Sequence, residues 1–246
     1  MGRTYKTQAV VLRSFRLGEA DRVLHLYTSD RGRVGAVAKG IRRTKSKIGA
    51  RLEPLSHVDM QLHQGSGELH TITSVDLLAS HRLAREEPYR LSVATIGLEA
   101  MLKLFPEQEA NERAFTALTR FLDQLDESPV LTPTRPALDP LVLSFQLKLL
   151  WVSGYQPHLD SCAECGAPDD LVGYLPSAGG VVCRACGPGT VPLSPEGLRA
   201  IGTLLRSPLA DAHEAGLSDR GAREALGLVI ASYEQYGSFR LKTLSA

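Results

Sequence analysis

Residues 58–63, Val-Asp-Met-Gln-Leu-His, alternate apolar and polar side chains without a break. A period of two is typical of a β-strand with one buried face. Four more runs of strand-like composition lie within the first 80 residues. Turn signals separate them, and they cover residues 8–17, 21–28, 33–41 and 69–75. The sequence therefore predicts five short strands in this part of the chain.

Five short strands fit a small closed barrel, because closure removes the exposed edges of the sheet. Of the barrels of this size, the oligonucleotide-binding (OB) type is the leading prediction. An SH3-like barrel is the alternative, since the number of strands does not separate the two.

The apolar period changes from two to 3.6 near residue 86, which predicts helices. Residues 88–104 carry one apolar stripe, which includes Leu91, and residues 110–125 carry another. Asp139 and Pro140 predict the N-cap and first turn of a helix that ends near Val152. This helix is apolar almost all round, Trp151 included, so we expect it at the centre of a bundle. Two more helices are predicted after the capping serines Ser194 and Ser218.

The predicted fold class is therefore multidomain β + α. Residues 1–80 form the OB-type barrel, and residues 81–246 form a helical bundle. A four-cysteine zinc ribbon is inserted into the bundle at about residues 158–192.

The overall composition is that of an ordinary globular protein, with 43% hydrophobic residues and a formal charge of +1. No apolar run is long enough to span a bilayer, and the first residues lack the apolar core of a signal peptide. We expect a cytoplasmic protein with no membrane partner, whose cysteines stay reduced.

The two parts of the chain differ in charge. Residues 1–80 hold 13 Lys and Arg against 7 Asp and Glu, a net +6, whereas residues 81–246 hold 15 against 20, a net −5. Residues 31–51 contain eight cations and no acid. Such a run predicts a polyanion partner, and a solvated basic loop explains it equally well. The candidate phosphate contacts are Lys39, Arg42, Arg43, Lys45, Lys47 and Arg51, with Arg13 and Arg16 as further candidates.

Aromatic side chains that could stack on bases are few in this basic part. They are Tyr5, Phe15 and Tyr27, and each is expected in the core rather than on the surface. Many cations and few stacking groups predict salt-sensitive binding with little sequence preference.

Four cysteines, Cys162, Cys165, Cys183 and Cys186, form two CxxC pairs separated by 17 residues. A hairpin between the pairs can bring four thiolates around one ion, as in a structural zinc site. The glycine after each pair lets the chain turn back, so that backbone N–H groups point at sulfur. Because four thiolates fill the coordination shell, we expect one structural Zn²⁺ that stabilises the insertion, with His158 a loop residue rather than a ligand.

The sequence lacks a P-loop, a dinucleotide fingerprint, a nucleophile elbow and the deaminase signature. We therefore expect a binding protein with no catalytic residues. Two other classes remain open: a zinc-ribbon RNA-binding or transcription-associated module, and an enzyme with an unrecognised site in the helical part. Residues 160–190 contain one base, Arg184, against four acids, which argues against a ribbon that binds nucleic acid.

Several of these stretches resemble the RecO family of bacterial recombination mediators. The matching stretches are residues 8–12, 18–21, 28–33 and 37–43, together with the two CxxC pairs. The order of a barrel followed by a zinc-bearing helical domain strengthens the resemblance, which extends over nearly the whole chain. Some members of the family lack the cysteines, whereas this sequence keeps all four.

The resemblance implies a DNA repair and recombination mediator. Its OB domain would bind single- and double-stranded DNA and anneal complementary strands without ATP. With RecR, the protein would help to load RecA onto DNA coated by single-strand-binding protein, which contacts the helical domain. The implied location is the cytoplasm, in association with the nucleoid.

Overall fold

The computed structural model describes residues 3–41, 49–127, 135–187 and 191–244. The chain divides into two compact units, one of residues 1–94 and 104–126 and the other of residues 95–103 and 127–246.

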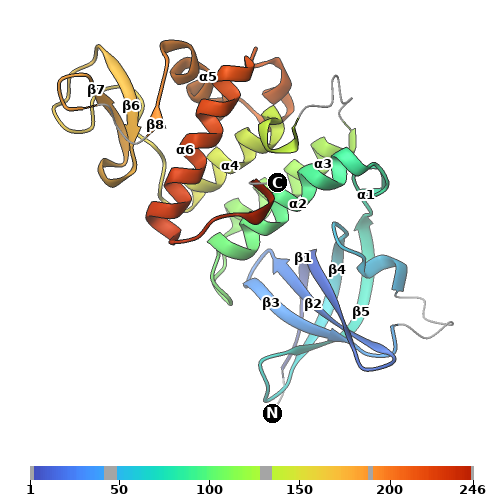
Figure 1. The fold of residues 1–246 in the computed structure, drawn as a ribbon. Coiled ribbons are helices and arrows are strands. Elements are labelled where there is room, and N and C mark those ends of the chain that lie inside the picture. The colour runs from blue at the N-terminus through green and yellow to red at the C-terminus, as the bar shows by residue number, and fades with distance from the viewer. Residues whose placement is uncertain (1–2, 42–48, 128–134, 188–190, 245–246) are drawn as a thin grey trace. The chain divides into compact units, whose positions relative to one another are not determined.

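The first unit is built on a five-stranded closed barrel (Figure 1). Its strands follow the order β1-β2-β3-β5-β4, in which β4 also pairs with β1. All of these pairs are antiparallel except β3 with β5, which is parallel. The five predicted strands are therefore present, as β1 (Arg3–Leu17), β2 (Asp21–Thr28), β3 (Gly32–Ala38), β4 (His57–Gln64) and β5 (His70–Ala79).

Side chains alternate between the inside and the outside of the barrel along each strand. Those that point inward are mostly small or branched and fill the interior. The alternating stretch 58–63 lies in β4, and its three apolar side chains belong to the core as predicted. The cluster of buried residues comprises Ala9, Val11, Leu24, Leu26, Val34, Ala36, Ala38, Ile41, Leu52, Val58, Met60, Leu62, Ile72 and Val75.

Helical segments cover part of the barrel's outer surface within the same unit. The ring of Phe105 meets Tyr27 at 5.5 Å, and the ring of Phe115 meets His57 at 5.6 Å. Tyr27 is completely buried, as predicted. The helices are α1 (Arg82–Glu86), α2 (Pro88–Leu104), whose residues 95–103 belong to the second unit, and α3 (Glu112–Glu127).

The second unit contains α4 (Pro140–Val152), α5 (Pro195–Arg206) and α6 (Asp219–Gly237), and α4 packs against both others. The predicted caps are confirmed, because each capping side chain accepts a hydrogen bond from a backbone N–H of the first turn. These caps are Asp139, Ser194 and Ser218.

Two predictions about apolar helix residues were wrong. Trp151, expected at the bundle centre, is 48% exposed because it lies in the last turn of α4. Leu91, expected on the buried stripe of α2, is 39% exposed. Within the described ranges, no helix combines the length and apolarity that crossing a bilayer requires.

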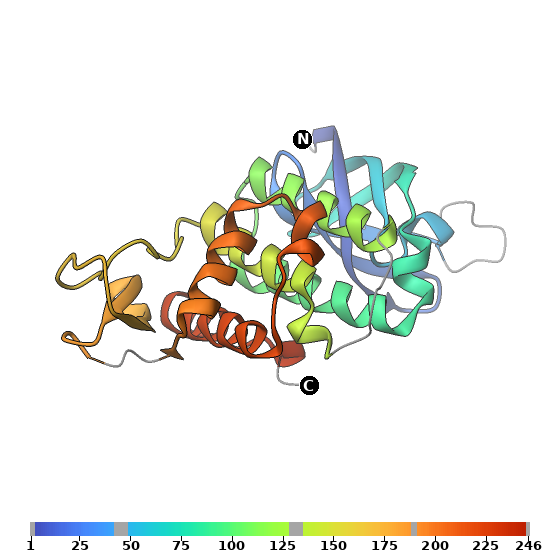
Figure 2. The same ribbon diagram turned by 90° about the horizontal axis from the view of Figure 1, so that it is seen from above.

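The cysteine-rich insertion folds as a three-stranded sheet next to α6 (Figure 2). Its strands are β6 (Leu171–Leu175), β7 (Gly180–Cys183) and β8 (Val191–Pro192), in the order β7-β6-β8. Two hydrogen bonds fasten it to α6: Tyr174 Oη to Ser232 Oγ at 2.8 Å, and Tyr236 Oη to the Pro176 carbonyl at 2.7 Å. Short 3₁₀ helices complete the chain at Gly49–Leu52 (η1), Pro136–Leu138 (η2), Pro176–Ala178 (η3), Leu209–Glu214 (η4) and Lys242–Leu244 (η5).

Candidate nucleic-acid interface and metal centre

One end of the barrel holds two of the cations expected to contact phosphate, Arg16 and Lys39. Strand register places Arg16 of β1 opposite Arg22 of β2, which in turn lies opposite Ala38 of β3, the residue before Lys39. The Gly40 N–H donates to Asp21 Oδ1 at 2.7 Å and fastens the exit of β3 to the turn between β1 and β2. Sequence reasoning missed Arg22, which the strand pairing alone places among these cations.

The basic segment, residues 39–51, begins with Lys39 at this end of the barrel. Its predicted contacts Arg42, Arg43, Lys45 and Lys47 lie outside the described residues. Arg51 lies in η1, where its Nη1 donates to the Val75 carbonyl at 2.8 Å and lies 3.7 Å from Asp76.

Acids balance some of the cations at this end. Glu53 pairs with Arg22 at 2.9 Å, and Asp76 pairs with Arg51. Within the part of the chain that the structure describes, no acid forms an ion pair with Arg16 or Lys39. Partly exposed ion pairs contribute little to stability, so Arg22 and Arg51 remain able to exchange a carboxylate for a phosphate.

The structure does not bring Arg13 and Arg16 to the same surface. The register of β1 against β2 shifts between Val11 and Arg13, so that Arg13 lies opposite His25 on the outer side of the barrel. Arg16 has the opposite strand parity and belongs to the row of cations at the barrel end. The two arginines therefore serve different faces.

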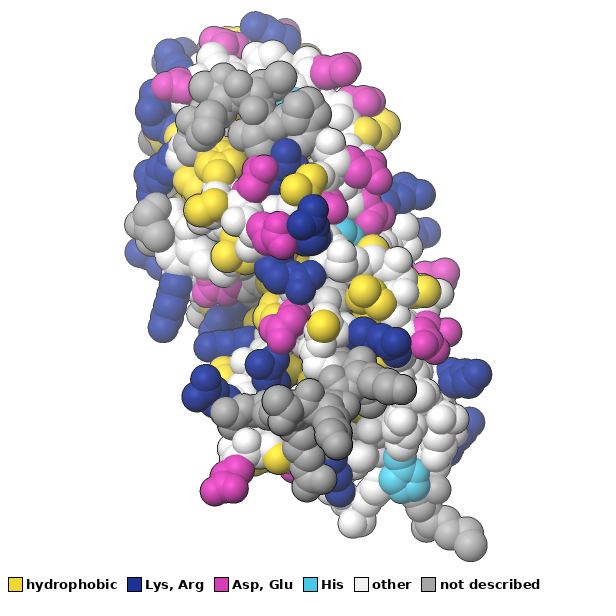
Figure 3. All heavy atoms as spheres, turned by 90° about the vertical axis from the view of Figure 1, so that its right-hand side faces the viewer, with side chains coloured by type: hydrophobic (Ala, Val, Ile, Leu, Met, Phe, Trp, Pro, Cys, Tyr) yellow, Lys and Arg dark blue, Asp and Glu magenta, His cyan; other side chains and the backbone are white. Residues whose placement is uncertain are grey.

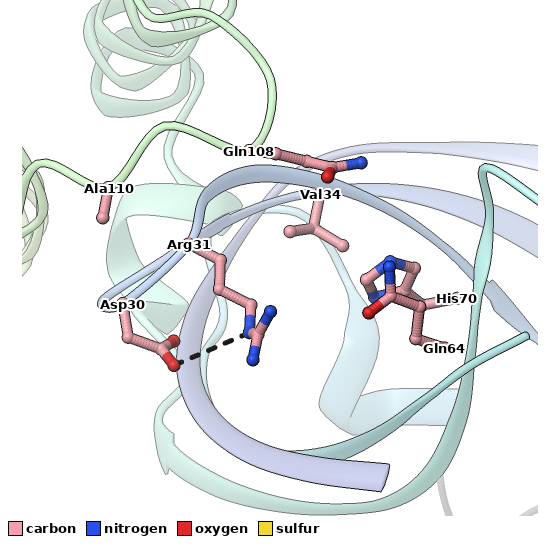
Figure 4. Close-up of a pocket in the computed structure, with 7 residues that line it drawn as sticks. All are labelled: Asp30, Arg31, Val34, Gln64, His70, Gln108 and Ala110. Carbon is pink, nitrogen blue, oxygen red and sulfur yellow. Dashed lines mark ion pairs between the residues drawn. The ribbon is translucent and has the colours of Figure 1, made fainter. Parts of the chain in front are cut away.

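The opposite end of the barrel contains a pocket of about 290 Å³ (Figure 4). In Figure 4 the Arg31 side chain reaches into it, with Asp30 beside it at 3.8 Å. The Arg31 guanidinium also lies 4.0 Å from the centre of the Tyr5 ring, and the Tyr5 hydroxyl hydrogen-bonds His70 Nδ1 at 2.5 Å. Burial, partly offset by Arg31, raises the pKa of Tyr5 to about 12. Tyr5 is thus covered and not available for stacking, in line with its predicted core position.

The surface in Figure 3 shows Lys and Arg side chains mixed with acidic and hydrophobic ones over the face drawn. No single uninterrupted basic patch occupies the described part of that face.

The four cysteines converge in the insertion. Their Sγ atoms all lie within 4.8 Å of one another, and those of Cys165 and Cys183 are 3.6 Å apart. Four sulfurs placed tetrahedrally at about 2.3 Å from Zn²⁺ are about 3.8 Å apart, so this set fits the ion. Gly166 and Gly187 adopt φ values of +77° and +124°, the conformations expected of the glycine after each pair.

The electrostatics of the cluster favour a bound cation. Backbone N–H groups of Cys165 and Cys183 donate to the Cys162 sulfur and lower the pKa of its thiol to about 6. Hydrogen bonding with the three other sulfurs raises the pKa of Cys186 to about 12. A divalent ion would remove this conflict, because it stabilises all four thiolates at once.

Two other polar residues of the insertion are already engaged. His158 Nε2 lies 2.8 Å from Ser161 Oγ, and the cluster does not include this histidine. Arg184, the single base of residues 160–190, pairs with Asp170 at 3.1 Å. The ribbon therefore offers little attraction to a polyanion.

Family models account for almost the whole chain. "Recombination protein O N terminal" matches residues 1–81, and "Recombination protein O C terminal" matches residues 85–245. The chain belongs to the RecO family. The resemblance stated from the sequence is therefore confirmed, and membership supports a role in DNA repair and recombination.

Individual RecO relatives match over most of their length. The DNA repair protein RecO of Rubrobacter xylanophilus is 41% identical over 235 residues, which cover 93% of this chain and 90% of the relative. That of Thermobifida fusca is 39% identical over 237 residues, with 94% and 93% coverage. That of Cutibacterium acnes is 39% identical over 191 residues, with 77% and 76% coverage.

Proposed function

We propose that this chain is a non-catalytic recombination mediator that binds single- and double-stranded DNA through the basic end of its barrel. RecO membership carries this proposal. The convergence of Arg16, Arg22 and the start of the basic segment at one barrel end supports it.

The strand order and the single parallel pair that closes the sheet support an OB-type barrel rather than an SH3-like one. In this proposal, residues 1–80 form the DNA-binding domain. Lys39, Arg42, Arg43, Lys45, Lys47 and Arg51 supply the main phosphate contacts, with Arg16 and Arg13 adding to them.

Annealing then follows from electrostatics. Two DNA strands repel each other, and cations that hold phosphates of both strands lower that repulsion. Base pairing supplies the driving free energy, so no nucleotide hydrolysis is required. As the resemblance implies, the protein would use this property with RecR to help load RecA onto strands coated by single-strand-binding protein.

The metal has a structural role in this proposal. Cys162, Cys165, Cys183 and Cys186 would hold one Zn²⁺ and close its coordination shell, which leaves no position for a reacting water. The ion would stabilise an insertion whose own apolar cluster is small.

Annealing of complementary oligonucleotides without ATP tests the function. The strands are used bare and coated with single-strand-binding protein, over a series of salt concentrations. We expect the wild-type chain to accelerate annealing most at low salt, and the double variant Arg42→Glu/Arg43→Glu to lose most of that acceleration. Wild-type protein that does not accelerate annealing at any salt would contradict the proposal.

A matched control separates local from overall charge. Arg199 and Arg223 lie exposed on α5 and α6 of the second unit. The double variant Arg199→Glu/Arg223→Glu makes the same change in net charge and should anneal like the wild type. Equal losses in both double variants would show that net charge, and not the basic segment, is responsible.

A further inference from the structure

Phe15 lies on the outer surface of the barrel because of a β-bulge. Strict alternation from Ala9 and Val11, which point into the core, would direct residues 13 and 15 inward as well. The register shift between Val11 and Arg13 inserts one extra residue and reverses this parity. As a result, Phe15 lies opposite Val23 and faces away from the core.

The phenyl ring stays accessible in this position. Phe15 is 40% exposed, whereas Tyr27 is completely buried and Tyr5 lies under Arg31. The next position along the row is Val37 on β3, a short side chain. Gly35, opposite His25, leaves room for the Leu69 side chain, whose Cδ2 would lie 2.7 Å from a Cβ at that position. Val37 and Leu69 therefore continue the apolar surface beside the ring.

Two neighbours hold the ring in place. The His25 ring meets it nearly perpendicularly, at 5.5 Å and 73°. The Arg13 guanidinium lies 4.5 Å from its centre. Burial, together with Arg33 and Arg13 and against the opposing effect of Glu107, lowers the pKa of His25. We call Arg13, Phe15 and His25 the stacking cluster.

We propose that the stacking cluster is a binding site for an unpaired nucleobase, with Phe15 as the stacking surface. This inference rests on the proposed DNA-binding function and identifies the form of DNA that the site selects. A base offers the flat π surface that an exposed phenyl ring binds, and the adjacent phosphate offers the charge that Arg13 needs.

A nucleobase binds the Phe15 ring more strongly than the Arg13 guanidinium does. An exposed cation–π contact is weaker than base–aromatic stacking, so a base can displace the Arg13 guanidinium from the ring. The freed guanidinium then pairs with the neighbouring phosphate. Bases inside a duplex are already stacked on one another and cannot reach the ring, which makes the site selective for single strands.

The site is continuous with the proposed phosphate-binding segment. Val37 lies in the same row as Phe15, two residues before Lys39. A strand whose base stacks on Phe15 can therefore continue along β3 to the basic segment without crossing the barrel.

Equilibrium binding to a single-stranded oligonucleotide and to the matching duplex tests the site. Phe15→Leu keeps an apolar strand residue and removes the ring. We expect it to weaken single-strand binding by about 5- to 30-fold and duplex binding by less than about twofold. Phe15→Tyr should restore single-strand binding. Leu17→Ala, which removes an exposed aliphatic side chain of the same strand, should change neither affinity.

An abasic oligonucleotide isolates the base. Loss of the bases should weaken binding of the wild type and should not weaken binding of Phe15→Leu any further. Single-strand affinity of Phe15→Leu equal to that of the wild type, while Arg42→Glu/Arg43→Glu loses binding, would overturn the stacking site and leave the proposed function intact. Equal losses on single strand and duplex, with an unchanged melting temperature, would also overturn it.

Fluorescence gives a direct reading from the site. Trp151 is the single tryptophan of the chain, so Phe15→Trp in a Trp151→Phe background places one reporter at the cluster. Its emission should be quenched by oligothymidylate and unchanged by the abasic oligonucleotide. Quenching of the same size by both would contradict stacking.

Discussion

Asp139 has two roles in the second unit. Its Oδ1 accepts the Leu141 N–H at 2.8 Å and caps α4, and the same atom lies 3.3 Å from His213 Nε2. The hydrogen bond with Asp139 raises the pKa of His213, although burial opposes the shift. The protonated imidazole is therefore the form that the folded state favours.

The stability of the protein should depend on pH through this pair. A raised histidine pKa gives stabilisation that is complete below the ordinary value of 6.5 and lost as pH rises through the folded-state value. We expect His213→Gln to remove this part of the pH dependence, measured as urea midpoints at several pH values above 6.5. Identical pH profiles for variant and wild type would contradict the assignment.

The cysteine cluster gives a second prediction at this scale. Cys165→Ser removes one of four thiolates, so bound zinc should fall well below one equivalent and the melting temperature should drop. Glu164→Gln, in the same CxxC pair, should retain both. DNA binding should persist in Cys165→Ser, because the proposed interface lies in the barrel. Wild-type protein purified without stoichiometric zinc would show that the cluster is not a zinc site.

At the scale of elements, α5 depends on a side chain from α4. Lys148 Nζ donates to the carbonyls of Leu204, Leu205 and Ser207, at 3.1, 3.0 and 2.7 Å. These carbonyls lie at the C-terminal end of α5, where helix geometry leaves acceptors without partners. Burial lowers the pKa of Lys148, and the three carbonyls and the helix dipole favour its charged form.

Lys148→Met should destabilise the second unit by about 1–3 kcal/mol, because it leaves the partly buried carbonyls of Leu205 and Ser207 without this donor, while Ser144 Oγ still donates to Leu204. The urea midpoint measures this loss. Lys103→Met changes an exposed lysine of α2 and serves as the control, with a shift close to zero expected. A midpoint for Lys148→Met equal to that of the control would show that the three contacts are not stabilising.

The sequence predicted most elements and a smaller part of the site. Local chemistry sets helix ends: Pro88 begins α2 as predicted, and Asp139 with Pro140 begins α4. Alternation was a reliable guide in β4 and failed in β1. There one extra residue reverses which side chains point inward, so the prediction that Phe15 lies in the core was wrong. The bulge arises in the pairing of β1 with the next strand, β2, and the pattern of apolar residues within β1 does not report it.

Across the whole molecule, the sequence divides into a basic and an acidic part, and ion pairs within the first unit neutralise some of the cations of the basic part. Within the first unit, Glu53, Glu107 and Asp76 pair with Arg22, Arg33 and Arg51. These pairs use acids of the same unit. The attraction for DNA should therefore come mainly from Arg13, Arg16 and the cations of the basic segment, and it should not depend on base sequence.

The salt dependence of DNA affinity shows whether the basic segment binds phosphate. The logarithm of the dissociation constant is measured against the logarithm of salt concentration, for wild type and for Arg42→Glu/Arg43→Glu, on several unrelated sequences. We predict weaker binding to every sequence and a slope that is flatter by about two, or roughly one unit per lost phosphate contact. Unchanged affinity and an unchanged slope would contradict the claim that the basic segment binds phosphate.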